Sequence, residues 1–194
     1  LLGLEKALED KDPEAIKTAV SKIIMLHGLI LAYGGIPMIY GGDELGALND
    51  YSYLKQAGKK QDSRWVNRPK HHWTKINKEL SRKDGLVYGI YNQLKQLIAL
   101  RKEFPCLADL NNLDLLELGN PHIFAFERRG KESSGILILA NFHETRQAVD
   151  STFLKNLGYC KKGLLQELTR GKKIKLKSGL LELGGYDLLW FKQF

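Results

Sequence analysis

The stretch GIPMIYGGDELG, residues 35–46, decides how the first half of this chain is interpreted. Within it, residues 36–40 are largely apolar and lie between two glycine pairs. A short apolar run bounded by turn residues is typical of a β-strand buried on both faces, as in parallel sheets covered by helices. Pro37 fits such a strand only near its start. We therefore predict a buried strand at residues 36–40, followed by a turn that carries Asp43 and Glu44.

Signals for two helices lie on either side of this predicted strand. For the first helix, Asp12 can serve as the cap, Pro13 suits the first position, and apolar residues then recur at helical spacing as far as a glycine pair. For the second helix, Asp84 can serve as the cap, an apolar stripe follows, and Pro105 lies just past the end. Arg101 falls in its last turn, where the negative end of the helix dipole favours a cation. A helix, a short strand and a glycine turn form an α/β pattern.

The predicted strand at residues 36–40 has no strand neighbour in the first half of the sequence. One strand with two helices cannot pair all its backbone groups or bury two apolar faces. We therefore expect the neighbouring strands to come from residues upstream of this sequence, or from a partner chain that covers the exposed strand.

After Pro105 the sequence changes to short segments of strand-forming residues separated by turn-forming residues. We predict strands at residues 113–118, 122–129, 135–142, 146–150, 163–168, 173–177, 180–183 and 186–192. Many short strands at regular spacing indicate an antiparallel β-sandwich. The chain is therefore predicted to have two domains, residues 1–104 of α/β character and residues 105–194 of all-β character.

Composition narrows the class of protein. The chain has 194 residues, of which 43% are hydrophobic and 27% charged, as in ordinary globular proteins. No uninterrupted apolar run approaches the roughly 20 residues of a membrane span, so we expect no membrane partner. Cys106 and Cys160 form no metal-type spacing, and two isolated thiols favour a cytoplasmic location. The histidines form no helical metal pair, and His27, inside the apolar helix, is predicted to be a hydrogen-bonded core residue.

The net charge of +8 raises the question of nucleic-acid binding. The densest group of basic residues is the lysine-rich stretch 172–177, where alternation over residues 173–177 places Lys173, Lys175 and Lys177 on one face of a strand. Neither interleaved aromatic residues nor a recognised RNA-binding motif accompanies them. We interpret these lysines as a solvated strand face and expect no nucleic-acid partner.

The residues best suited to chemistry follow the predicted strand. Asp43 and Glu44 could form an acid/base pair at a strand end, or one of them could fix the loop by accepting backbone hydrogen bonds, which is the interpretation we favour. In the long polar connection that follows, Asp62, Arg64 and Trp65 are suited to sugar recognition. A guanidinium group binds hydroxyls or carboxylates, and an indole face stacks on a sugar ring. The alternative is an exposed loop with a surface ion pair.

Residues 35–46 resemble the end of the eighth barrel strand in the α-amylase superfamily, glycoside hydrolase family 13. The stretches LNDYSYL at residues 48–54 and DSRWVNRP at residues 62–69 narrow the resemblance to the amylosucrase branch, which builds α-glucan from sucrose. NPHIFAF at residues 120–126 and ANF at residues 140–142 are similar to the C-terminal β domain of such enzymes. The resemblance covers nearly the whole chain.

The resemblance implies an α/β part followed by an all-β part. Residues 1–104 correspond to the last strand and helices of a (β/α)8 barrel, and residues 105–194 to an antiparallel C-terminal β-sandwich. The three catalytic carboxylates of the family lie upstream of the matching segment, so this chain is expected to hold no catalytic residue and to be inactive alone. Arg64 matches an arginine that closes the floor of the glucose pocket through a salt bridge to an upstream acidic residue, and Asp62 lies beside it in the same substrate-binding motif. No cofactor and no metal are implied.

Two functions remain open at this point. In the first, the chain is the C-terminal part of a retaining α-glucosyl transferase or hydrolase that acts on sucrose or α-glucan, and its structural partner is the missing barrel portion. In the second, it is a carbohydrate-binding or purely structural β-sandwich module without catalysis, which could hold glucan through aromatic residues such as Trp190 or Tyr159. Trp190 lies in an apolar run and is more simply interpreted as a core residue.

Overall fold

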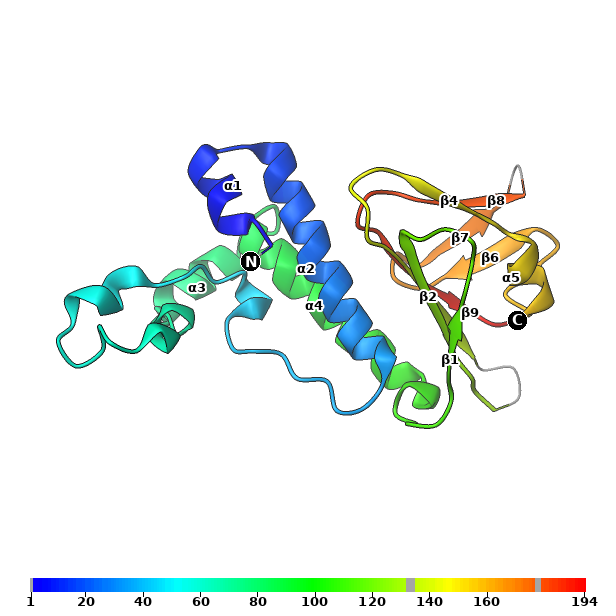
Figure 1. Ribbon diagram of the computed structural model, residues 1–194, viewed down its shortest axis with the longest axis horizontal. Coiled ribbons are helices and arrows are strands. Elements are labelled where there is room, and N and C mark those ends of the chain that lie inside the picture. Colours follow the sequence, from blue (N-terminus) through cyan, green and yellow to red (C-terminus); the bar gives the residue numbers. More distant parts are fainter. Residues whose placement is uncertain (1, 132–134, 177–178) are drawn as a thin grey trace. The chain divides into compact units, whose positions relative to one another are not determined.

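The computed structural model describes residues 2–131, 135–176 and 179–194 of the chain. Figure 1 shows its helices and strands, coloured along the sequence from the N-terminus to the C-terminus. Lys177, the last residue of the lysine-rich stretch, lies outside the described residues.

The protein packs into two compact units that are not continuous in sequence. Unit 1 comprises Leu1–Val20 and Ile39–Gln93, and unit 2 comprises Ser21–Met38 and Leu94–Phe194. These units are defined by packing. The predicted domains, residues 1–104 and 105–194, are continuous stretches of sequence and differ from these packing units, so that division stays a prediction.

Unit 1 is built from short helices and from the first turns of two long ones. Its elements are α1 (Leu4–Asp10), the start of α2 (Pro13–Tyr33), η1 (Asp43–Leu45), η2 (Tyr51–Lys55), η3 (Ser63–Asn67), α3 (Trp73–Leu80) and the start of α4 (Leu86–Glu103), where η marks a 3-10 helix. Both α2 and α4 confirm the predicted helices. The sequence did not predict α1 and α3, because seven and eight residues are too few for a clear apolar period.

The start of α2 has the predicted cap. The Asp12 carboxylate accepts hydrogen bonds from the backbone N–H groups of Glu14, at 3.0 Å, and Ala15, at 3.1 Å. Further along α2, His27 is buried and its Nδ1 lies 2.8 Å from the carbonyl oxygen of Ile23. His27 is therefore a hydrogen-bonded core residue, as predicted.

By length and composition alone, α2 is also long and apolar enough to cross a membrane. A core helix passes the same test, and α2 carries buried side chains from Ala19 to Ala32. A side chain at Gly28 would collide with Leu188 of the β region, with its Cβ 2.0 Å from the Leu188 Cδ2 atom. A third of the apolar window of α2 is buried in the structure, so the absence of a membrane partner stays a prediction.

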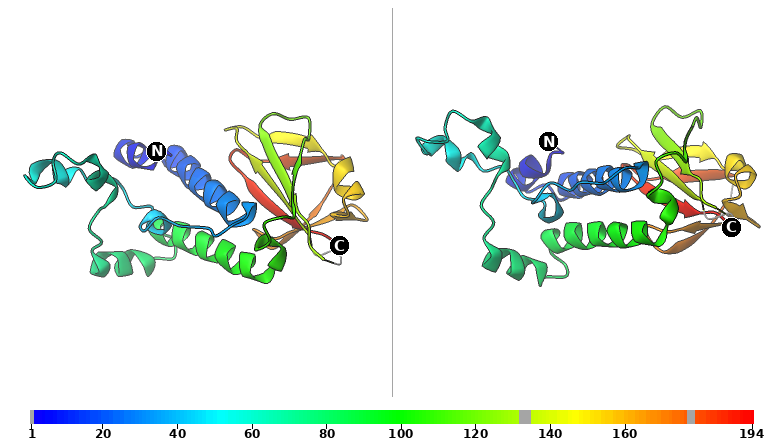
Figure 2. Two further views of the ribbon diagram at one scale, coloured as in Figure 1. Left: turned by 60° about the horizontal axis from the view of Figure 1, so that its bottom comes forward. Right: turned by 90° about the horizontal axis from the view of Figure 1, so that it is seen from below.

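Unit 2 contains two antiparallel sheets, whose strands Figure 2 shows from two further directions. The larger sheet has the order β1-β2-β3-β9-β6-β5, with β7 paired to β6, and the smaller one pairs β4 with β8. The strands are β1 (Leu113–Leu116), β2 (Ile123–Arg128), β3 (Ile136–Asn141), β4 (Gln147–Asp150), β5 (Cys160–Lys161), β6 (Leu164–Glu167), β7 (Lys172–Lys175), β8 (Leu180–Leu183) and β9 (Leu188–Lys192). A short helix, α5 (Thr152–Asn156), connects β4 to β5.

An apolar cluster with side chains from both sheets lies in unit 2. Leu139 of β3, Phe191 of β9 and Leu183 of β8 belong to it, and none of these side chains is exposed. On the larger sheet, Tyr33 at the end of α2 contacts the ring of Phe126 of β2, with 5.4 Å between ring centroids. The predicted antiparallel β domain is therefore confirmed, and each predicted strand from residue 113 onward has a counterpart in the described residues.

The strand predicted at residues 36–40 is absent, and that prediction was wrong for this chain. The segment is not assigned to any strand, and in the described part of the chain all strand pairs form among β1 to β9. Ile36 is 92% exposed, Met38 82% and Tyr40 55%. A strand exists only through its hydrogen-bonded neighbours, and the described residues offer none at that place.

Candidate functional site

The candidate site is the loop of unit 1 that carries η2 and η3. Each of these 3-10 helices is preceded by an aspartate whose carboxylate caps it. Asp50 accepts a hydrogen bond from the backbone N–H of Ser52 at 2.9 Å, and Asp62 accepts one from that of Arg64 at 3.0 Å. The backbone N–H of Asp50 donates to the carbonyl oxygen of Val66 at 2.8 Å, which holds the two helices together. The polar connection is therefore an ordered loop.

Arg64 and Asp62, the predicted substrate-binding residues, contact each other in this loop. The Arg64 Nε atom donates to Asp62 Oδ1 at 2.8 Å, and Nη2 donates to Oδ2 at 2.9 Å. This two-pronged pairing is the geometry in which arginine binds a carboxylate most strongly. The side-chain hydrogen bond from Arg64 holds the pKa of Asp62 below its ordinary value and raises that of Arg64.

The Arg64–Asp62 pair is accessible to solvent. The Arg64 side chain is 75% exposed and that of Asp62 33% exposed. Some N–H groups of the guanidinium and some lone pairs of the carboxylate therefore face water. The hydroxyl groups of a ligand could replace this water. An exposed ion pair of this kind contributes little to folding. The pair is chemically suited to binding a polyhydroxylated molecule.

Two cations lie against the indole ring of Trp65, which the sequence did not predict. Lys59 Nζ is 4.1 Å from the ring centroid and the Arg68 guanidinium carbon is 5.6 Å from it. These are cation–π distances. Lys59 reaches the ring because the chain turns at residues 56–60, where Lys59 and Lys60 both donate backbone hydrogen bonds to Gln56. The sequence contains both cations within a few residues of Trp65, but it gave no signal for the turn that brings Lys59 to the ring.

Asp43 and Glu44 lie in the tight turn after the extended segment. A Glu44 carboxylate oxygen accepts a hydrogen bond from the backbone N–H of Gly42 at 2.8 Å, and Gly42 itself has a φ of +109°. The carbonyl oxygen of Gly42 accepts from the backbone N–H of Ala47 at 2.9 Å. Glu44 thus fixes the loop through a backbone hydrogen bond, as the favoured interpretation predicted.

The aromatic residues considered for sugar binding in the β domain are in its core. Trp190 and Tyr159 are both completely buried. The Tyr159 hydroxyl donates to Glu127 Oε1 at 2.8 Å, and burial, the main cause, raises the pKa of this phenol far above its ordinary value. Neither ring can stack on a sugar, so a binding module that uses these two residues is ruled out. No group of three metal-binding side chains occurs among the described residues, and we assign no metal site.

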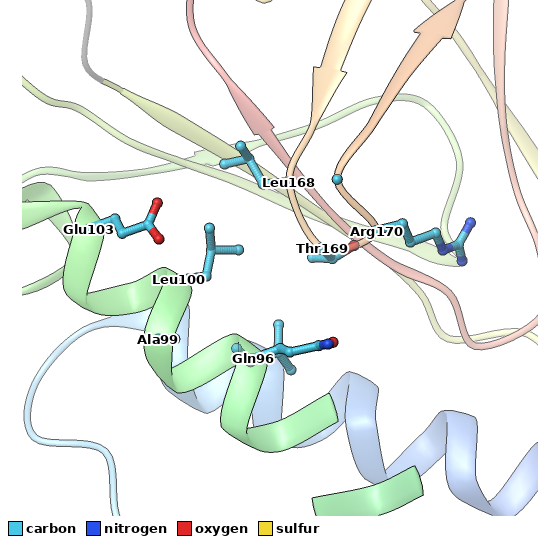
Figure 3. A pocket seen from close by; sticks show the side chains of 9 residues that line it. Gln96, Ala99, Leu100, Glu103, Leu168, Thr169 and Arg170 are labelled. Carbon is cyan, nitrogen blue, oxygen red and sulfur yellow. The ribbon is translucent and has the colours of Figure 1, made fainter. Parts of the chain in front are cut away.

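A cavity of about 380 Å³ is present within unit 2 (Figure 3). Figure 3 shows Gln96, Leu100 and Glu103 of α4 on one side and the turn 168–171 between β6 and β7 on the other. Its volume is in the range of small-molecule sites. Volume alone does not identify a ligand. A ligand site also needs polar groups that are available to bind the ligand.

The polar groups of the turn are already bound within the protein. Thr169 donates its hydroxyl hydrogen bond to Glu167, and Arg170 Nη2 donates to Asp187 Oδ1 at 2.5 Å. Glu167 is itself buried and also accepts from the backbone N–H of Arg170 at 3.0 Å. These bonds shape the turn, and we assign no ligand to the cavity.

No protein-family model matches this chain. Glucosylglycerate phosphorylase of Escherichia coli (strain K12) is 28% identical to it over 134 residues, which are 69% of this chain and 23% of that protein. The 1,4-alpha-glucan branching enzyme GlgB of Bacillus caldolyticus is 24% identical over 153 residues, 75% of this chain and 20% of that protein. The chain therefore spans a quarter or less of the length of these curated relatives.

Solved structures show the same fold. Amy13B of Eubacterium rectale superposes with a TM-score of 0.61 at 21% sequence identity, and the match covers 91% of this chain and 35% of that protein. The sequence relatives and the structural neighbours are enzymes of the α-amylase family, glycoside hydrolase family 13. The antiparallel β domain of this chain matches the C-terminal domains of such enzymes.

Proposed function

We propose that this chain is the C-terminal part of an α-amylase-family enzyme that transfers or hydrolyses α-glucosyl units with retention of configuration, acting on sucrose or α-glucan in the manner of amylosucrase. The observation that carries the proposal is the similarity, over 69% of the chain, to an enzyme named for a glucosyl compound. The motifs at residues 35–46 and 62–69, on which the resemblance to the family rests, support it. In this proposal the whole protein is a cytoplasmic enzyme.

Two segments of the chain have distinct tasks in the proposed enzyme. The segment 36–40 is the last strand of the barrel and pairs with strands supplied upstream or by a partner chain. Its apolar side chains support this role, because Ile36 and Met38 lie almost fully in water in the chain alone. Exposed apolar residues in a row mark a surface that another part of a protein covers.

Arg64 and Asp62 bind the glucosyl unit in the proposed enzyme. The guanidinium and the carboxylate offer donors and acceptors side by side, which suits the hydroxyl groups of a sugar. The resemblance gives Arg64 an acidic partner upstream, whereas within this chain its partner is Asp62. Arg64 therefore exchanges or shares its carboxylate when the upstream part is present. The chain supplies no catalytic carboxylate in this proposal, so it is inactive alone.

The coding sequence upstream of this chain tests the proposal. We expect it to encode further barrel strands with the nucleophile, acid/base and stabilising carboxylates. The longer protein should release fructose from sucrose or transfer glucosyl units between glucans, and the 194-residue chain should not. An upstream sequence without barrel strands, or sustained fructose release by the chain alone, contradicts the proposal.

Within the longer protein, the role of Arg64 is tested by Arg64→Ala. We expect kcat/KM to fall about 10- to 100-fold, because a hydrogen bond from a charged group is lost. The matched control is Arg82→Ala, which removes an exposed arginine of the same unit that pairs with Glu79 at 3.4 Å. Equal activity of the two variants would show that Arg64 is a surface residue.

A further inference from the structure

The C-terminus of α2 is capped by arginine side chains from elsewhere in unit 2. The last carbonyl groups of a helix have no partner inside the helix. Arg101 of α4 donates from Nη1 to the carbonyl oxygen of Leu31, and from Nη2 to that of Gly35 at 3.0 Å. The carbonyl oxygen of Ala32 accepts a hydrogen bond from Arg128 Nη1 at 2.7 Å. Two guanidinium groups thus bind three carbonyl groups around the end of this helix.

Arg128, at the end of β2, also ties the loop that precedes β1. Its Nε donates to Asn112 Oδ1 at 2.8 Å. Its Nη2 donates to the carbonyl oxygen of Cys106 at 3.2 Å and to that of Asp109. The whole Arg128 side chain is buried, with no exposed surface. One guanidinium group therefore joins α2, the loop before β1 and the sheet.

The two arginines bind neutral oxygen atoms. Every acceptor that the described residues offer to their guanidinium groups is a carbonyl or amide oxygen. Burial, the main cause, lowers the pKa of both arginines. For Arg128, Cys106 and Asp109 oppose this shift and the charge of Arg101 adds to it. Opposing this, the negative end of the α2 dipole favours cations. A buried cation without such acceptors is costly, so these hydrogen bonds must be well formed.

We propose that Arg101 and Arg128 act together as positioning residues that fix Gly35 and thereby set the point and direction in which the segment 36–40 leaves α2. We call this pair the arginine cap. Gly35 is the residue directly before the segment, and its carbonyl oxygen is held by Arg101. Through Arg128 the sheet of the β domain controls a segment more than 80 residues earlier in the chain. The proposal concerns this chain by itself, so it stands or falls separately from the proposed enzyme.

The glycine pair that ends α2 is adapted to this cap. Gly34 has a φ of +135°, and a Cβ atom there would lie 3.1 Å from Arg128 Nη1. The absence of a side chain at this position lets the guanidinium group reach the Ala32 carbonyl. Only arginine offers a planar fork with five N–H donors, whereas lysine is a compact point charge with three. The cap therefore depends on arginine and not merely on positive charge.

Hydrogen exchange of backbone amides tests the proposal on the full chain. With Arg128→Met, we expect exchange in residues 29–36 and 106–112 to accelerate about tenfold or more, since bonds to a charged group are lost, and exchange in β3 to change far less. Arg128→Lys should behave like Arg128→Met. The control is Arg129→Met at the neighbouring position. Arg129 is 65% exposed and pairs with Asp114, so this substitution should leave the exchange rates of both regions unchanged.

Two further measurements keep the test decisive if Arg128→Met does not fold. Arg101→Met removes the half of the cap that holds Gly35 and should accelerate exchange in residues 29–36 with little effect at 106–112. In Arg128→Ala, millimolar ethylguanidinium should restore slow exchange, and ethylammonium at the same concentration should not. Uniform acceleration across the molecule, full function of lysine at position 128, or unchanged exchange in Arg101→Met would overturn the proposal.

Discussion

Two apolar segments of this chain, β3 and residues 36–40, look alike in sequence and differ completely in structure. Both follow a glycine and both consist mainly of apolar residues. In β3 all six residues are buried, and the strand pairs with β2 on one side and β9 on the other. In the segment 36–40, three of the five residues are exposed and no strand pair forms in the described structure. Local sequence favours an extended chain, but only neighbouring strands turn it into a sheet.

The largest effect is expected from Leu139→Ala in β3. Leu139 is completely buried between the sheets, so its truncation should lower the free energy of unfolding by about 2–5 kcal/mol. Urea unfolding followed by circular dichroism measures this change. Leu115→Ala in β1, where the side chain is 60% exposed, is the control and should change stability by less than about 0.5 kcal/mol. Equal effects would mean that β3 is not the centre of the core.

The β region could be predicted from the sequence because each of its strands finds its partners inside the chain. The predicted strands at 113–118 and 180–183 are observed as β1 and β8. β5 was not predicted, because two residues are too short to show an alternating pattern. The strand predicted at residues 36–40 is not observed although its pattern was clear, because no strand of the described residues pairs with this segment.

In the candidate site, the sequence predicted the residues better than their contacts. It singled out Arg64 and Asp62, which contact each other in the structure. The upstream acidic partner that the resemblance implies for Arg64 stays a prediction. For Arg101 it predicted a cation near a helix C-terminus. That prediction is confirmed, because Arg101 lies in the last turn of α4. The sequence did not predict that its side chain donates hydrogen bonds to carbonyl groups at the end of α2. Contacts between distant segments depend on the fold, which no local pattern contains.

Tyr159→Phe tests a polar contact inside the well-paired region. Losing the hydrogen bond to buried Glu127 should cost about 1–3 kcal/mol at neutral pH, measured by urea unfolding. Because the folded-state pKa of Tyr159 is raised above its ordinary value of 10.0, the native state keeps the phenol proton after the unfolded chain has lost it. Stability of the parent protein should therefore fall above pH 10, by about 1.4 kcal/mol per pH unit from this group.

The pH dependence has its control in the same variant. Tyr159→Phe removes the titrating group, so the difference in stability between parent and variant should shrink as the pH rises above 10. Other groups that titrate at high pH contribute equally to both proteins and cancel in this difference. A constant difference between pH 8 and pH 11 would show that Tyr159 is not held in its protonated form by burial.

Gly34→Ala tests the junction between α2 and the segment 36–40. Alanine at a φ of +135° is strained, and its Cβ would press on Arg128, so we expect a loss of at least about 1 kcal/mol. Exchange in residues 29–36 should accelerate at the same time. The control is Gly89→Ala, inside α4, where a Cβ meets no atom within 4 Å and a gain of about 0.5–1 kcal/mol is expected. A gain at both positions would show that Gly34 is not needed for the arginine cap.

The smallest effect is expected from Met38→Ser. This substitution tests the segment 36–40 in the same way that Leu139→Ala tests β3. Met38 is 82% exposed, so in this chain the free energy of unfolding should change by less than about 0.5 kcal/mol. In the longer protein of the proposed function, where the segment pairs with neighbouring strands, the same change should cost about 1 kcal/mol or more, because an apolar side chain then leaves a buried face. Urea unfolding of both proteins measures the contrast. A large loss in the chain alone would mean that the segment is already packed there, and the difference from β3 would disappear.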